Sequence, residues 1–211
     1  SMTQAALTPQ NLFGLDRTQL RACFAEMGEK PFRADQVMQW IYRRTADDFE
    51  QMSNISKDLR VKMKQHFVIQ HPELVTEQVS QDGTRKWALR LDGGNVIETV
   101  YIPEADRGTL CISSQVGCAM DCSFCSTAQQ GLNRNMTTAE IVAQVWFAAR
   151  TLGGDFQNER VISNVVFMGM GAPLPNTAAV LPATPIMPAH LAFGLPNPPL
   201  PVPTPALAPF I

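Results

Sequence analysis

One stretch in the second half of the chain alternates between strand and helix patterns in a way that leaves few possible folds. Gly108–Ser114 has an apolar strand pattern, and Ile162–Met168 has the pattern of a buried strand. Between them, Thr137 and Glu140 have the spacing of a capping box, which predicts a helix ending near Leu152. A strand, a helix and a second strand in this order predict a parallel βαβ unit, the repeating piece of α/β barrels. We therefore expect an α/β fold.

The loop between the first strand and the helix carries three closely spaced cysteines, Cys118, Cys122 and Cys125. Their C-x-x-x-C-x-x-C spacing supplies three thiolates to a cluster of four irons, which leaves one iron open to a small molecule. Radical S-adenosylmethionine (SAM) enzymes use this arrangement, and Phe124 is the residue type that they favour before the last cysteine. A structural zinc site and a disulfide are the alternative interpretations of the cysteines.

Apolar residues recur at a spacing of three or four between about residues 16 and 70, which predicts a small helical domain. We expect Gly28–Pro31 to break the first helix and Asp35 to lie in the first turn of the second. Cys23 falls on the apolar stripe of the first helix, so we expect an inert core thiol. The recurring residues are Leu20, Cys23, Phe24 and Met27, then Val37, Trp40 and Ile41, then Ile55, Leu59 and Met63.

Strand patterns replace the helical ones from about residue 75. Lys86–Leu91 and Val96–Ile102 flank a turn at Asp92–Asn95, which predicts a β-hairpin. The patterns divide the chain into a helical accessory domain (1–73), a β-hairpin linker region (74–107), the start of a barrel (108–171) and a tail (172–211).

The tail differs in composition from the rest of the chain. Residues 172–211 contain no Asp, Glu, Lys or Arg and hold twelve of the 16 prolines. Proline removes a backbone donor, so this density excludes helix interiors and central strands. We expect a Pro- and Ala-rich tail, with a ligand for SH3-type modules as its functional alternative.

Charge and hydropathy bear on partners and location. The net charge is −2, but most basic residues precede residue 108 and form groups at Lys30/Arg33, Arg43/Arg44 and Lys57–Lys64. Either a surface for RNA or a solvated helical face explains these groups. The sequence contains neither an apolar signal segment nor a membrane span, and we expect a cytoplasmic protein.

Several segments resemble the RlmN/Cfr family of radical SAM RNA methyltransferases, and within it the dual-specificity RlmN type. The resemblance covers about residues 12–171. The segments that carry it are Gly28–Val37, Glu98–Pro103, Cys111–Cys118, Cys125–Gly131, Asn164–Val166 and Met168–Gly171. It implies that the barrel is a radical SAM partial (β/α)6 barrel, of which this chain holds the beginning.

The resemblance also implies roles for individual residues. The family's [4Fe–4S] ligands match Cys118, Cys122 and Cys125, and its SAM-binding positions match Phe124, Gly169, Gly171 and Ala172. Glu98 matches a catalytic proton acceptor, with a solvated side chain as the alternative. Cys111 matches a catalytic cysteine that forms a disulfide with a methyl-carrying cysteine near the family's C-terminus, with a buried small residue as the alternative. For the glycines the alternative is a plain turn.

The implied reaction is methylation of C2 of adenine in 23S rRNA and in tRNA next to the anticodon. One SAM methylates a protein cysteine, and the reduced cluster cleaves a second SAM to a 5′-deoxyadenosyl radical. Expected partners are these RNAs and a reductant such as flavodoxin, and we expect a monomer without membrane association. A Cfr-like C8 methyltransferase and a non-catalytic RNA-binding or iron–sulfur-carrying fragment are the alternatives.

The chain departs from the family after Gly171. Ala172 stands where the family has a glutamate, and prolines replace family residues after Leu191–Leu195, so we interpret the tail as a degraded or misread copy. The family's remaining barrel units and its methyl-carrying cysteine would lie beyond residue 211. We therefore expect this chain alone to be inactive.

Overall fold

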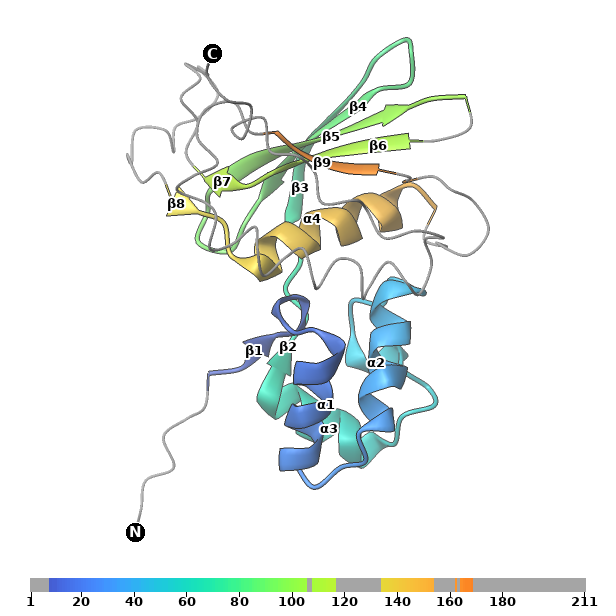
Figure 1. Ribbon diagram of the computed structural model, residues 1–211, viewed down its shortest axis with the longest axis vertical. Coiled ribbons are helices and arrows are strands. Elements are labelled where there is room, and N and C mark those ends of the chain that lie inside the picture. Colours follow the sequence, from blue (N-terminus) through green and yellow to red (C-terminus); the bar gives the residue numbers. More distant parts are fainter. Residues whose placement is uncertain (1–7, 106–107, 117–133, 154–161, 163, 169–211) are drawn as a thin grey trace, which may run out of the picture.

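A computed structural model of the chain describes residues 8–105, 108–116, 134–153, 162 and 164–168 (Figure 1). The described parts form a helical region, a five-stranded sheet and one long helix, α4 (Thr138–Thr151), that lies between them. The predicted α/β class is confirmed. Residues 172–211, which we interpret as a degenerate tail, lie outside the described residues.

The helical region is closed by its own two ends. Strand β1 (Gln10–Asn11) pairs in parallel with β2 (Phe67–Val68), so the start and the finish of the region lie side by side. Between them run η1 (Leu12–Gly14), α1 (Arg17–Glu26), α2 (Phe32–Tyr42), η2 (Phe49–Gln51) and α3 (Lys57–His66).

Local chemistry explains where the first helices begin and end. Asp16 forms a capping box with Gln19 at the start of α1. After α1, Gly28 takes a φ of 78°, a left-handed conformation that favours glycine and stops the helix. Asp35 lies in the first turn of α2, as predicted, and binds Arg17 at 2.9 Å and Arg21 at 2.6 Å.

Two details of the helical region differ from the sequence expectation. Cys23 is half-buried at the edge of the core rather than inside it, because α1 turns this position partly toward solvent. Ile55 is buried but precedes α3, which begins only after the cap that the Ser56 hydroxyl provides to the Leu59 amide.

The sheet has the strand order β3-β4-β5-β6-β9. Strands β3 (Glu73–Val79), β4 (Arg85–Arg90), β5 (Val96–Pro103) and β6 (Gly108–Ser113) pair antiparallel in sequence order. The predicted hairpin is the β4–β5 pair, and its turn places Gly93 and Gly94 at a φ of 94°. The structure adds β3, which pairs with β4 ahead of the hairpin.

The predicted βαβ unit is present. Strand β9 (Asn164–Met168) pairs in parallel with β6, with Cys111 opposite Val166, and α4 lies between the two strands in the chain. The predicted capping box is formed by Thr137 and Glu140 at the start of α4. Two further short strands, β7 (Gln115–Val116) and β8 (Arg134–Asn135), pair antiparallel beside the sheet.

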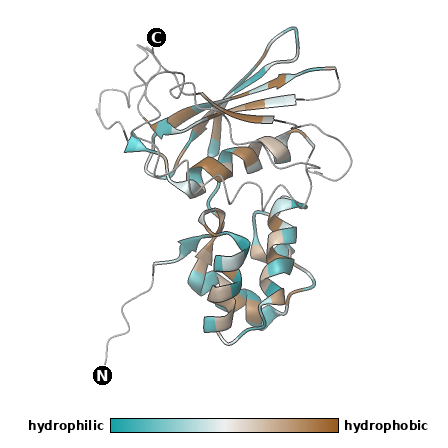
Figure 2. Ribbon diagram, in the orientation of Figure 1, coloured by the Kyte–Doolittle hydropathy of each residue, from teal (hydrophilic) through white to brown (hydrophobic). Residues whose placement is uncertain are grey.

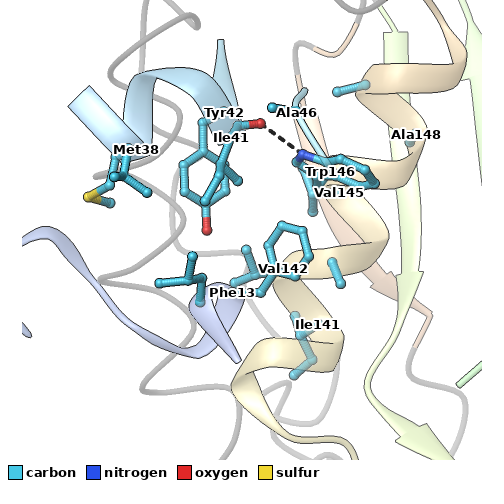
Figure 3. Close-up of a cluster of buried hydrophobic side chains, with 14 of the residues drawn as sticks. Phe13, Met38, Ile41, Tyr42, Ala46, Ile141, Val142, Val145, Trp146 and Ala148 are labelled. Atoms are coloured by element: carbon cyan, nitrogen blue, oxygen red, sulfur yellow. Dashed lines mark hydrogen bonds between the residues drawn. The ribbon is translucent and has the colours of Figure 1, made fainter. Parts of the chain in front are cut away.

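Helix α4 is buried on both sides, which makes it the common core of the sheet and the helical region. Toward the helices, Val142 and Trp146 pack near Phe13 and Ile41 (Figure 3). Helix α4 is coloured largely as apolar in Figure 2, which agrees with its buried position. The Trp146 Nε1–H donates to the carbonyl oxygen of Ile41 at 2.8 Å, and this carbonyl lies in the last turn of α2. The bond therefore satisfies an acceptor that the helix itself leaves unpaired.

The basic group on α3 is largely neutralised by acidic neighbours. Lys62 binds Glu29 at 2.8 Å, and Lys64 and Arg60 bind Glu50 at 2.6 and 3.2 Å. These contacts favour the solvated-face interpretation for this group. None of the helices within the described ranges is both long enough and apolar enough to cross a membrane.

Candidate active site at the carboxyl edge of the sheet

The residues of β6 alternate between the two faces of the sheet. Leu110 and Ile112 are fully buried on the face that α4 covers. Thr109, Cys111 and Ser113 alternate with them, are only half-buried and lie on the opposite face. We call this second face the open face.

Cys111 lies on the open face, two residues before the end of β6. Its neighbours across the strands are Val100 on β5 and Val166 on β9. Both Cys111 and Cys23 are free thiols, and burial raises the pKa of each above its ordinary value. At neutral pH Cys111 is therefore mostly the thiol, which is a weaker nucleophile than the thiolate. The disulfide that the family resemblance implies for Cys111 stays a prediction.

Glu98 lies on the same face as Cys111, because it precedes Val100 on β5 by two residues. Its side chain is exposed, and among the described residues its carboxylate has no hydrogen-bond or ion-pair partner. Its backbone oxygen accepts a hydrogen bond from the Ser113 hydroxyl at 2.5 Å. Glu98 is thus beside Ser113, the last residue of β6, which lies two residues beyond Cys111.

The ends of β6 and β9 coincide at this place. The strands are parallel, and Ser113 is opposite Met168, the last residue of β9. Glu98 and Cys111 therefore lie at the carboxyl edge of the parallel pair. In α/β folds this is the edge at which ligands and catalytic groups gather.

The segment that carries the cluster cysteines begins and ends at this edge. It follows Val116 on β7 and precedes Arg134 on β8, and the β7–β8 pair holds these two residues opposite each other. The Arg134 guanidinium binds the Glu140 carboxylate through two bonds of 2.7 and 2.9 Å, which ties β8 to the first turn of α4. Burial opposes ionisation of Glu140, but the bonds from Arg134 and from the Thr137 amide outweigh it and lower its pKa.

Gln144 completes the framework, and the sequence analysis missed it. It lies on α4 with no exposed surface and binds Thr99 of β5 and Ser113 of β6. A signal was present, since Gln144 is the single polar residue in the apolar run Ile141–Ala149. A buried polar group has hydrogen-bond partners as a rule, so an uncharged amide in such a run indicates a specific contact.

The remaining predicted site residues lie outside the described residues. They are Cys118, Cys122 and Cys125 for the cluster and Phe124, Gly169, Gly171 and Ala172 for SAM. Within the part of the chain that the structure describes, no group of three or more His, Cys, Asp or Glu side chains could hold a metal ion. The structure thus places Glu98 and Cys111 on one face of the sheet, and the roles of all the predicted site residues stay predictions.

Comparison with known proteins gives this edge a family context. Residues 10–69 match the family described as the ribosomal RNA large subunit methyltransferase N-terminal domain. The chain is 56% identical over 185 residues to the dual-specificity RNA methyltransferase RlmN of Alkalilimnicola ehrlichii, an alignment that covers 88% of this chain and 51% of the relative. By sequence, the chain is a relative of the RlmN methyltransferases.

A solved structure supports the same relationship. The chain is similar to the crystal structure of a radical SAM methyltransferase from Sphaerobacter thermophilus, with a TM-score of 0.71 and 38% identity, over 85% of this chain and 52% of that one. The expectation of a radical SAM fold is thereby confirmed. The chain spans about half the length of the RlmN relative and of the solved methyltransferase.

Proposed function

We propose that this chain supplies the N-terminal domain and the cluster-binding part of a radical SAM methyltransferase. The proposed reaction is methylation of C2 of adenine in 23S rRNA and in tRNA next to the anticodon. The similarity to RlmN supports the reaction class and the RNA substrate. A one-electron reductant such as flavodoxin is the further partner that this chemistry requires.

One observation carries the proposal. Cys111 and Glu98 share the open face, and both lie at the edge where the cysteine-bearing segment begins and ends. A thiol and a carboxylate on one face of the sheet, beside this segment, are the arrangement that the proposed roles need.

The donor set fits a [4Fe–4S] cluster. Cys118, Cys122 and Cys125 provide three thiol ligands close together in a chain that holds no other group of metal-ligating side chains within its described parts. When bound, the cluster and SAM would supply the one-electron chemistry that removes hydrogen from an unactivated carbon. The paired strands β7 and β8 keep the two ends of the ligand segment together.

The open face supplies the acid–base and nucleophilic groups. The exposed carboxylate of Glu98 can reach a substrate and accept the proton that the adenine carbon loses. As a thiolate, the Cys111 sulfur could attack the sulfur of a second cysteine that carries the nucleic acid through a methylene carbon. A disulfide would form, the sulfur–carbon bond would break, and its electron pair would leave with the methylated adenine. Because burial raises the Cys111 pKa, a nearby base or an increase in pH is needed to form the thiolate.

A cluster experiment tests the metal assignment on the full chain. After anaerobic reconstitution, Cys118→Ala, Cys122→Ala and Cys125→Ala should each lose the brown colour and bound iron of the wild type. Cys23→Ala is the matched control and should keep both, because Cys23 lies on α1 in the helical region. Loss of iron in the control, or retained iron in all three variants, would contradict the assignment.

A graft tests the reaction. Residues 1–171 are fused to the C-terminal half of an RlmN relative, with Ala172→Glu included, and the fusion is assayed on 23S rRNA fragments and tRNA. We expect 2-methyladenosine by mass spectrometry against standards, lost in Cys111→Ala and Glu98→Gln and kept in Lys86→Ala on the same face. 8-Methyladenosine would indicate the Cfr-type reaction, and a graft with an intact cluster and no product would refute the proposal.

A further inference from the structure

We infer that Gln144 is a positioning residue for the proposed reaction: its side-chain amide bridges β5 and β6 and so fixes Glu98 relative to Cys111. This inference rests on the proposed function for its catalytic meaning. Its geometric content stands on the structure alone.

Every polar atom of the Gln144 side-chain amide has a partner. The Gln144 Oε1 accepts from the Thr99 hydroxyl and from the Ser113 amide, each at 2.9 Å. The Nε2 donates to the Ser113 carbonyl at 2.8 Å and contacts the Met136 sulfur at 3.7 Å. Both lone-pair directions of the oxygen and both hydrogens of the nitrogen are thus used.

The orientation of the amide follows from its partners. The Ser113 N–H can only donate and the Ser113 carbonyl can only accept, so Oε1 must face the first and Nε2 the second. No rotation of the side chain about its last bond satisfies Ser113 equally well. The contact is therefore specific for a planar group with an acceptor and a donor side by side.

The Gln144 contacts lie where the backbone pairing of β5 and β6 ends. In the described residues, the paired register of β5 and β6 runs from Pro103 opposite Gly108 to Val100 opposite Cys111 and goes no further. Beyond Cys111, the strands are joined by the Gln144 amide, which links Thr99 to Ser113, and by the Ser113 hydroxyl, which binds the Glu98 carbonyl. A side chain from α4 thus replaces the backbone ladder where the strands reach the active edge.

The Gln144 bridge lies next to both candidate catalytic residues in the chain. Glu98 adjoins Thr99, and Cys111 is two residues from Ser113 on the same strand. The bridge therefore holds the two strand ends that carry the carboxylate and the thiol. Without it, the partly buried Ser113 N–H and carbonyl would lose their Gln144 partners, which favours a shift of the backbone toward other partners or water.

The test is the alkylation rate of Cys111 in the full chain, measured by peptide mass spectrometry after limited treatment with iodoacetamide. Gln144→Leu keeps the approximate volume and removes every hydrogen bond, and should raise the Cys111 rate about tenfold because the strand end opens more often. Gln144→Glu keeps the shape and the accepting oxygen, and since burial favours the protonated carboxyl, its hydroxyl can donate to the Ser113 carbonyl in place of the amide. It should give a smaller increase of about threefold.

Two controls separate positioning from general loosening. Cys23 on α1 reports global opening in the same molecules, and its rate should not change. Val142→Ala removes volume from the side of α4 that faces the helical region and leaves the Gln144 contacts in place, so it should leave the ratio of the Cys111 to the Cys23 rate unchanged. If Gln144→Leu does not fold, Gln144→Glu carries the test on its own.

The outcomes are distinct. A Cys111 rate that rises without Cys23 supports the inference. An unchanged Cys111 rate in both Gln144 variants, or thiols that rise together, would overturn it while leaving the proposed function in place. Failure of the wild-type chain to take up iron on anaerobic reconstitution would overturn the proposed function and the catalytic meaning of Gln144 with it.

Discussion

The two faces of the sheet are formed by the same strands but have different roles. On the covered face, Trp87, Leu110 and Ile112 are fully buried against α4 and its surroundings. On the open face, the residues that alternate with them along β4 and β6 are at least partly accessible, including Lys86 and Cys111. The difference shows that stability and reactivity in this molecule are separated by a single step along a strand.

Replacement of Trp87 should have the largest effect on stability. Trp87 has no exposed surface, donates a hydrogen bond to Glu77 at 2.5 Å and meets Phe147 edge to face. Trp87→Ala should lower the free energy of unfolding by about 3–5 kcal/mol, as measured by urea denaturation. Its neighbour Lys86 lies on the open face, and Lys86→Ala should change that energy by about 0.5 kcal/mol or less. Similar losses in the two variants would break the comparison of the faces.

Trp146→Phe should have the next largest effect. A phenyl ring still fills part of the space near Phe13, but the Ile41 carbonyl loses its donor. We expect a loss of about 1–3 kcal/mol, because a buried acceptor is left unsatisfied. Trp146→Ala, which also removes the ring, should cost clearly more in the same urea titration. A neutral Trp146→Phe would mean that water replaces the indole.

The Arg134–Glu140 pair should make stability depend on pH. The pKa of Glu140 is lowered in the folded protein, so the contribution of the pair is complete above the ordinary value of 4.5 and is lost as pH falls through the folded value. Glu140→Gln should therefore be less stable than the wild type by about 1 kcal/mol at pH 7. The two proteins should converge in strongly acidic solution. A difference that persists there would assign the effect to helix capping instead of charge.

Replacement of Cys111 should have the smallest effect on stability. Cys111→Ser places a hydroxyl on the half-buried open face and should change the free energy of unfolding by about 1 kcal/mol or less. The same change should abolish methylation in the graft, because a serine hydroxyl cannot exchange with sulfur. A large loss of stability would instead identify Cys111 as a packing residue. This variant sharpens the comparison of the two faces, because it should abolish methylation while leaving the free energy of unfolding nearly unchanged.

Alkylation of Cys111 should also depend on pH in a defined direction. Burial raises its pKa, so the rate should be low at neutral pH and should still increase above the pH at which an unhindered thiol is fully ionised. Denatured chain is the control and should react at the ordinary pKa. Equal profiles in folded and denatured chain would show that the open face does not shield the thiol.

Local patterns in the sequence were enough to predict the helical region, the β4–β5 hairpin and the βαβ unit, but not β3 or the short strands. The capping box of Thr137 and Glu140, the turn before Val96 and the apolar strand before the cysteines depend on neighbours in the chain, and all are present. Contacts between elements were not predictable in the same way. The Gln144 bridge depends on the register of α4 against two strands, and the β1–β2 pair joins residues far apart in sequence.

The candidate site was predictable only in part, for a physical reason. The cysteine spacing indicates a ligand set because metal ligands must be close together, and here they are close in the sequence itself. Glu98 and Cys111 are thirteen residues apart in the chain. Composition and periodicity gave no reason to join them, and their roles came from family resemblance. Their common face follows from the antiparallel register of β5 and β6.

Strand β3 is an edge strand of the described sheet, and its Leu74, Val75 and Val79 side chains are exposed. An exposed edge strand can pair with a strand of another molecule, which starts aggregation. The register between β3 and β4 is interrupted between Leu74 and Thr76, which leaves Val75 as an extra residue. An irregularity of this kind bends the strand and interrupts the even row of donors and acceptors that an incoming chain must match. The bulge at Val75 therefore makes this apolar stretch of the edge strand a poor template for an incoming strand.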